Sequence, residues 1–140
     1  LENLHISCGW FDTSVSFGEP GFEERETIKN GLQVAAKSGF TSIALNANTN
    51  PVIDSKSDVE YLIHKAFNTA TNLYPIGALT KESKGIEIAE LYDMQQSGAI
   101  AFGDYNKAIQ NANIQKIALQ YLKEALTLVL RIKEMQCIII

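Results

Sequence analysis

The sequence predicts an α/β fold in which parallel strands alternate with helices, corresponding to the N-terminal half of a (β/α)8 barrel. Short apolar segments recur about every 25 to 35 residues, and a segment with helical periodicity separates each pair. No GxGxxG sequence follows the first strand-like segment, which disfavours an open dinucleotide-binding sheet. The chain has 140 residues, whereas an eight-unit barrel takes roughly 250. We therefore expect about half of a TIM-like barrel.

The first strand and the first helix flank a turn. Residues 4–17 carry aromatic and β-branched side chains typical of a strand. Residues 19–22 read Glu-Pro-Gly-Phe, and proline followed by glycine favours a turn. The helix expected over 23–38 has acidic residues in its first turn, an apolar stripe and Gly39 as its stop signal.

The second and third units follow the same order. Residues 40–45 form a short buried strand, and the polar loop 46–51 comes after it. Residues 57–70 keep apolar side chains three and four positions apart, which predicts a helix. Residues 72–79 are the next strand, and 80–85 are the loop that follows.

The last part of the chain contains two more helices and two more strands. The helix over 86–97 is ended by Gly98, and a strand is expected over 99–102. The longest helix is predicted over 113–133, and the β-branched end at 136–140 predicts a final strand.

Composition limits the kind of partner. The net charge of -4 and the pI near 5.1 argue against a nucleic-acid-binding surface, which would need a basic stripe. No apolar run approaches the roughly 18 residues of a membrane span. Cys8 and Cys137 lie far apart in apolar surroundings, so we expect buried, reduced thiols in a cytoplasmic protein. The chain starts at Leu1 and ends on an apolar run, so residues 1–140 are expected to be one partial barrel domain of a longer chain.

In a barrel of this kind the working residues lie at the carboxyl ends of the strands. Ser14 and Ser16 are two positions apart on the first strand, so their side chains face the same side. That spacing suits two metal ligands, but serine is a poor ligand for zinc. We therefore expect Ser14 and Ser16 to fill the barrel mouth as small polar residues rather than to bind a metal.

Three asparagines follow the second strand. Asn46, Asn48 and Asn50 could bind a carboxylate or an amide through their side-chain amides. They could equally form the local turns that are typical of a loop before Pro51. The sequence leaves both interpretations open.

The remaining polar candidates are weaker. Asp104, at the end of the fourth strand beside Tyr105, could bind a metal or act as a base, although no histidine lies near it in the sequence. His5 and His64 are expected at the surface, and the loop with Lys81, Glu82 and Lys84 is expected to be solvated.

Two long stretches of the sequence together point to a known family. They are GWFDTSVSFGEPGFEERETIKNGLQVAAKSGFTSIALNANTNPVID and LYPIGALTKESKGIEIAELYDMQQSGAIAFGD. Both resemble the dihydroorotases, the metal-dependent cyclic amidohydrolases of pyrimidine biosynthesis. The family pattern is a strand ending Asp-x-His-x-His-x-Arg-Glu-Pro-Gly, followed by Asn-Thr-x-Pro and Pro-Ile-Gly-Ala segments. The likeness runs from about Gly9 to Asp104. It implies the metal-dependent hydrolase version of the barrel.

The resemblance places the family's metal-binding histidines on Ser14 and Ser16. It places the substrate-binding arginine on Gly18 and the metal-binding aspartate on Tyr105. The substrate-binding asparagine is retained as Asn48. The frame of the first motif is also retained, as Asp12 and Glu19-Pro20-Gly21. The family's later ligands would fall beyond Ile140.

These replacements predict a dihydroorotase-like protein without catalysis, in which no cofactor is expected although active family members bind zinc. The resemblance implies a structural or regulatory partner of aspartate transcarbamoylase. The alternative is an active cyclic amidohydrolase whose altered metal site takes ligands from elsewhere. A third possibility is a small-molecule binder that uses Asn48 without turnover. Because a half barrel would expose two sheet edges, a homo-oligomer is also expected.

Overall fold

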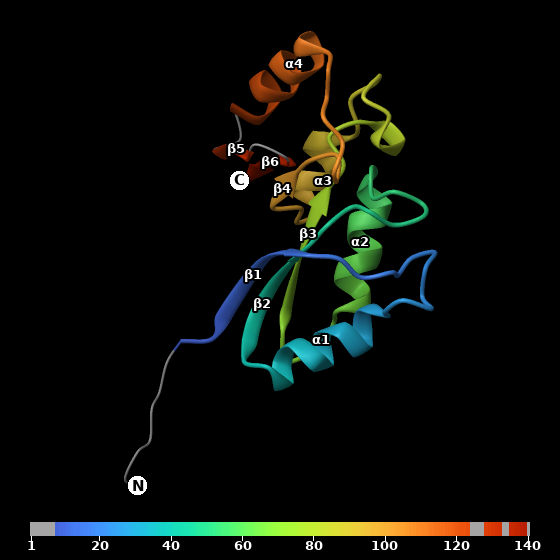
Figure 1. Ribbon diagram of the computed structural model, residues 1–140, viewed down its shortest axis with the longest axis vertical. Coiled ribbons are helices and arrows are strands. Elements are labelled where there is room, and N and C mark those ends of the chain that lie inside the picture. The colour runs from blue at the N-terminus through green and yellow to red at the C-terminus, as the bar shows by residue number, and fades with distance from the viewer. Residues whose placement is uncertain (1–7, 124–127, 133–134, 140) are drawn as a thin grey trace, which may run out of the picture.

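The computed structural model describes residues 8–123, 128–132 and 135–139, with side chains described over 8–121. Four parallel strands lie side by side in the order of the chain: β1 (Trp10–Val15), β2 (Phe40–Leu45), β3 (Asn72–Gly77) and β4 (Ala101–Phe102). All three pairings between neighbours are parallel. This is the predicted half of a TIM-like barrel (Figure 1).

Each parallel strand is followed by a helix, as the α/β prediction requires. The helices are α1 (Ile28–Lys37), α2 (Lys56–Lys65), the short η1 (Lys81–Ser83), α3 (Leu91–Gln96) and α4 (Ala112–Lys123). Figure 1 shows α1 and α2 together on one side of β1, β2 and β3. In the described part of the chain, no helix is long and apolar enough to cross a membrane.

The helices are shorter than their sequence patterns predict. Helix α1 starts at Ile28 rather than at residue 23, because Thr27 is the N-cap and its side chain accepts a hydrogen bond from the Asn30 N–H. The acidic residues before it lie in a separate turn. Helix α2 ends at Lys65, since Asn68 takes a left-handed backbone with φ of 61°. The start predicted for α3 was also early, because residues 86–90 are not helical.

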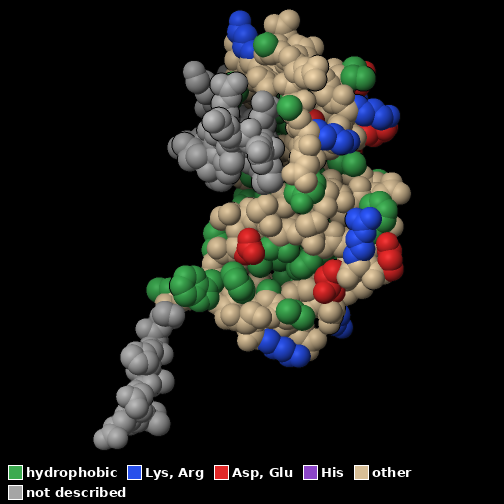
Figure 2. All heavy atoms as spheres, viewed as in Figure 1, with side chains coloured by type: hydrophobic (Ala, Val, Ile, Leu, Met, Phe, Trp, Pro, Cys, Tyr) green, Lys and Arg blue, Asp and Glu red, His purple; other side chains and the backbone are tan. Residues whose placement is uncertain are grey.

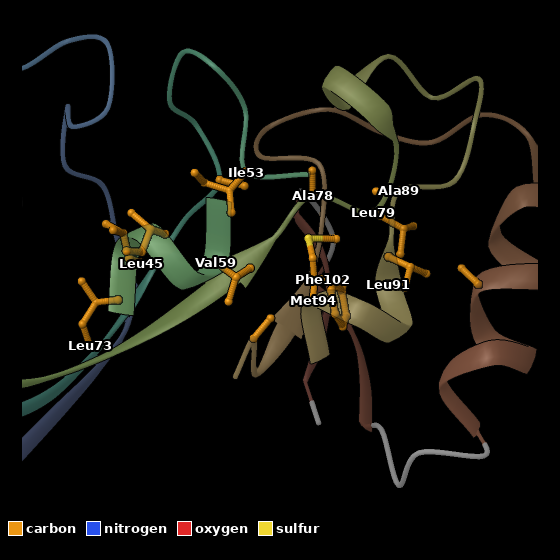
Figure 3. Packing of buried hydrophobic residues seen from close by; sticks show 14 of the residues in the cluster. Leu45, Ile53, Val59, Leu73, Ala78, Leu79, Ala89, Leu91, Met94 and Phe102 are labelled. Carbon is orange, nitrogen blue, oxygen red and sulfur yellow. The ribbon is translucent and has the colours of Figure 1, made fainter. Parts of the chain in front are cut away.

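The core lies between the sheet and the helices that cover it. Helices and strands contribute its fully buried side chains, among them Ile28, Leu32, Ile43, Leu45, Val59, Leu62, Met94 and Phe102. Figure 3 shows Leu45, Leu73 and Val59 in one part of this cluster and Met94 beside Phe102 in another. A smaller cluster of Ala44, Ile76 and Ala101 packs separately.

The C-terminal part differs from the prediction. The helix predicted over 113–133 was wrong at its C-terminal end, because Leu128–Ile132 is a strand, β5. It pairs antiparallel with β6 (Met135–Ile139), and β6 pairs antiparallel with β4. An apolar run such as Leu128–Ile132 fits either period, and strand pairing decided the outcome. The sheet therefore ends at β1 and β5, and the edge of β4 is covered.

The β1 edge exposes apolar side chains. Trp10 is 65% exposed and Phe11 is 50% exposed. Figure 2 shows hydrophobic side chains gathered where the chain enters this strand.

Cys8 is also exposed, so the prediction that it is buried was wrong, because the strand begins after it. Cys137 and His5 lie outside the residues whose side chains are described, and His64 is exposed, as predicted.

Candidate functional site

The carboxyl ends of β1 and β2 bring four polar side chains together. Val15 of β1 is paired with Leu45 of β2, so the residues on either side of this pair meet at one edge of the sheet. Ser14 belongs to β1, Ser16 follows it, and Asn46 and Asn48 follow β2. Residues more than 30 positions apart in sequence therefore become neighbours.

Each serine is bound to an asparagine. The Asn46 Nδ2 donates to Ser14 Oγ at 3.1 Å and to the Val15 carbonyl at 3.0 Å. The Asn48 Nδ2 donates to Ser16 Oγ. Asn46 is buried, and the Oδ1 of Asn48 is also buried, without a partner among the described residues. The constellation is polar and uncharged, and these two amides reach across to β1 rather than closing local turns.

The donor set at these positions does not fit zinc. The serine hydroxyls already accept hydrogen bonds from amides, and alcohol oxygen is a poor zinc ligand compared with imidazole, thiolate or carboxylate. The nearby carboxylate of Asp12 accepts from the Ser14 N–H at 3.0 Å. Over the described residues, no three His, Cys, Asp or Glu side chains gather into a possible metal-binding group.

Gly18 lies in a turn that leaves no room for a side chain. Its N–H donates to the Glu26 carbonyl at 2.9 Å, and its carbonyl accepts from the Phe22 N–H at 2.9 Å. A Cβ at this position would lie 1.8 Å from the Phe22 carbonyl oxygen. The turn also needs Gly21, which has φ of 93°. An arginine at position 18 is therefore incompatible with this backbone.

Glu19 joins that turn to two helices. The residue is buried, at 6% exposed. Its carboxylate accepts from the Ile28 N–H at 2.9 Å and from the Tyr61 hydroxyl at 3.0 Å, and it pairs with Lys65 Nζ at 2.9 Å. Burial alone would raise the pKa of Glu19, but the hydrogen bonds from Lys65, Ile28 and Tyr61 outweigh it and the pKa is lowered. The hydrogen bond to Glu19 raises the pKa of Lys65. This carboxylate is a structural anchor for the β1 end.

Asp104 has a structural environment as well. It is 3% exposed, and its Oδ1 accepts from the Leu79 and Thr80 N–H groups at 3.0 Å each. Its Oδ2 accepts from the Thr80 hydroxyl. The aspartate therefore ties the end of β4 to the end of β3. Tyr105 follows it, half-buried.

Sequence reasoning missed the partners of Glu19. Tyr61 and Lys65 are separated from it by more than 40 positions. Their spacing of four places them on one face of α2, but nothing in the sequence says which carboxylate that face meets.

The side chains of Lys81, Glu82 and Lys84 are exposed, as expected for a solvated loop. Lys81 forms an ion pair with Glu87 at 3.2 Å, and Lys84 forms one with Glu82.

Comparisons with known proteins agree with the resemblance. The family model described as dihydro-orotase-like matches residues 5–135. The chain is 46% identical over 113 residues to a dihydroorotase of Pelotomaculum thermopropionicum, covering 81% of this chain and 26% of that protein. It is 42% identical over 121 residues to a dihydroorotase of Acetivibrio thermocellus, covering 86% of this chain and 28% of that protein. A dihydroorotase of Ruminiclostridium cellulolyticum is 40% identical over 119 residues, with 84% and 28% covered. The chain thus spans little more than a quarter of the length of these curated relatives.

Proposed function

The chain belongs to the dihydro-orotase-like family, and from this premise we propose that it serves pyrimidine biosynthesis without catalysing hydrolysis. Its proposed role is that of a cytoplasmic structural or regulatory partner of aspartate transcarbamoylase. The match to proteins named dihydroorotase supports the proposed role in pyrimidine biosynthesis. The chemistry at the β1 end supports the loss of activity.

The observation that carries this proposal is the pairing of Ser14 with Asn46 and of Ser16 with Asn48. The resemblance assigns the two serine positions to metal-binding histidines. A bound zinc ion lowers the pKa of its water to about 7, and that chemistry depends on imidazole or carboxylate ligands. Hydroxyls that already accept amide hydrogen bonds cannot supply it.

Gly18 provides a second line of support. The resemblance assigns this position to the arginine that binds the substrate carboxylate. A guanidinium forms a bidentate pair with a carboxylate, and glycine has no group that replaces it. The Phe22 carbonyl oxygen occupies the space in which a side chain at position 18 would start. The backbone of this turn is therefore also unsuited to an arginine. Asn48 then remains as the proposed substrate-contacting group.

The test uses the full-length protein that contains this chain. We expect substoichiometric zinc by elemental analysis and no cyclisation of carbamoyl aspartate or hydrolysis of dihydroorotate above background. Stoichiometric zinc together with turnover would establish the alternative, an active amidohydrolase with an altered metal site. In that case Asn48→Ala should abolish turnover, whereas Asn50→Ala, an exposed neighbour, should not.

The partnership needs a separate experiment. Purified full-length protein and aspartate transcarbamoylase from the same organism should elute together in size-exclusion chromatography with light scattering. Separate elution at micromolar concentrations of both proteins would contradict the partnership. The mass of the protein alone tests whether it forms a homo-oligomer, which is the other proposed assembly.

A further inference from the structure

A small pocket lies between α1 and the turn that joins α2 to β3. Its volume is about 230 Å³, which suits a ligand smaller than the drug-sized molecules that fill sites of about 300–1,000 Å³. Both segments contribute to its lining, which consists of Lys29, Leu32, Gln33, Ala36, Thr69 and Ala70. In Figure 1 the end of α2 and the start of β3 lie beside α1. We call it the helix pocket. Its turn precedes β3, whereas the polar site described above follows β1 and β2.

Hydrogen bonds hold the turn that forms one wall of the helix pocket. Thr69 Oγ1 lies 2.8 Å from the Ala66 carbonyl and 2.9 Å from the Thr71 carbonyl, and it donates toward both. The buried hydroxyl of Thr71 donates to the Phe40 carbonyl at 2.8 Å, at the start of β2. Asn68 takes a left-handed conformation with φ of 61°, which non-glycine residues keep only where surrounding contacts hold them. This wall is therefore formed before a ligand binds.

The floor of the helix pocket is apolar. Leu32 belongs to the fully buried core, and Ala36 lies one turn further along the same face of α1. Ala70 adds a methyl group from the turn. Such a floor favours the hydrocarbon part of a ligand, because each methylene that leaves water strengthens binding about fourfold.

The rim of the helix pocket is positively charged. Lys29 and Gln33 are exposed and lie four positions apart on α1, which contains no acidic residue. In the part of the chain that the structure describes, no acidic side chain pairs with Lys29. The Glu26 carboxylate, just before the helix, accepts from the Thr27 N–H at 2.9 Å and from Asn30 Nδ2 at 3.0 Å. The Lys29 ammonium is thus available to an anion, and Gln33 offers an amide donor beside it.

From this combination we propose that the helix pocket binds a short aliphatic monocarboxylate, the anion of a small fatty acid. The alkyl chain lies on the floor formed by Leu32, Ala36 and Ala70. The carboxylate pairs with Lys29 and accepts a hydrogen bond from the Gln33 amide. A second carboxylate would meet the apolar floor without a partner, which disfavours dicarboxylates. The inference rests on α1 and the turn before β3 alone, so it stands or falls independently of the proposed function.

The test is saturation-transfer NMR of the full-length protein that contains this chain, titrated with hexanoate at an ionic strength of about 0.15 M. Hexanoate should bind saturably and about tenfold more tightly than butyrate, because two further methylenes leave water. Neutral hexanamide, the matched ligand without a charge, should bind about threefold to fivefold more weakly, as expected for the loss of an exposed ion pair. The proposal is overturned if hexanoate shows no saturable binding or binds no more tightly than butyrate.

A charge variant tests the rim. Lys29→Gln should weaken hexanoate binding about threefold to fivefold and leave hexanamide binding unchanged. Lys37→Gln removes the same charge from the same helix but does not line the pocket, so it should change neither. Equal effects of the two variants on hexanoate binding would overturn the assignment of an anion.

Filling variants test the floor. Ala36→Met places a longer side chain of good helix propensity in the pocket, and Ala70→Met does so from the exposed turn on the other side. Each should abolish hexanoate binding. Val34→Met, at an exposed position of α1 outside the pocket, should not affect it. Unchanged binding in either filling variant would show that hexanoate binds elsewhere and would overturn the site.

Discussion

Replacement of Asp104 by alanine should strongly destabilise the protein. The carboxylate accepts three hydrogen bonds from Leu79 and Thr80, both of which are at most 3% exposed. Its removal leaves two backbone N–H groups without their acceptor, and each such group costs about 1–3 kcal/mol. We therefore expect the free energy of unfolding to fall by about 4 kcal/mol. Single domains are stable by about 5–15 kcal/mol, so this loss is a large fraction of the total.

The measurement is urea unfolding of the full-length protein followed by circular dichroism, with the free energy taken from the midpoint and the slope. Asp104→Asn is the matched control, because its amide oxygen can still accept from the Leu79 and Thr80 N–H groups, and its loss should be less than half. Asp12→Ala is the second control. Asp12 is half-buried and accepts from the Ser14 N–H, so its loss should stay below about 1.5 kcal/mol.

A small effect at Asp104 would refute this reasoning. If Asp104→Ala costs no more than Asp12→Ala, the three hydrogen bonds at the end of β3 do not stabilise the fold. The prediction from sequence that Asp104 is a base or a metal ligand would then deserve renewed tests of activity.

Two further predictions concern the β1 turn. Because the pKa of Glu19 is lowered, its contribution to stability is complete above the ordinary value of 4.5 and is lost as the pH falls through the lowered value. Thermal unfolding on both sides of pH 4.5 should therefore show a smaller acid-induced loss in Glu19→Gln, and an identical loss would contradict the assignment. The raised pKa of Lys65 acts only in alkali, where its contribution is lost as the pH rises through a value above 10.5. Gly18→Ala should lower the free energy of unfolding in urea by about 1–3 kcal/mol, because the added methyl group would lie 1.8 Å from the Phe22 carbonyl oxygen. An unchanged urea midpoint would show that the turn rearranges to accept the methyl group without loss of stability.

Much of the architecture could be predicted because it follows from local periodicity. The alternation of apolar strands and amphipathic helices is encoded within windows of about 10 residues, and the four parallel strands were found where these patterns indicated. Helix limits were less predictable. Thr27 starts α1 through a side-chain cap, although the acidic residues before it indicated an earlier start. Asn68, with its left-handed backbone, follows the end of α2, although the apolar spacing continues past it.

The candidate site could be predicted only in its composition. The positions of Ser14, Ser16 and Asn48 follow from the strand and loop pattern. Their hydrogen bonds depend on the β1–β2 register, which the sequence alone does not specify. The role of Asp104 was open for the same reason, because its partners Leu79 and Thr80 belong to another strand end.

Local sequence thus determined the βα repeat, the Glu19-Pro20-Gly21 turn and the residues at the strand ends, since propensity and periodicity act over a few neighbouring residues. Tertiary structure alone decided which of those residues touch. It paired the serines with asparagines more than 30 positions away and closed the space at Gly18 with the Phe22 carbonyl. It also placed an antiparallel strand on the edge of β4. Contacts of this kind depend on how separate elements pack against one another.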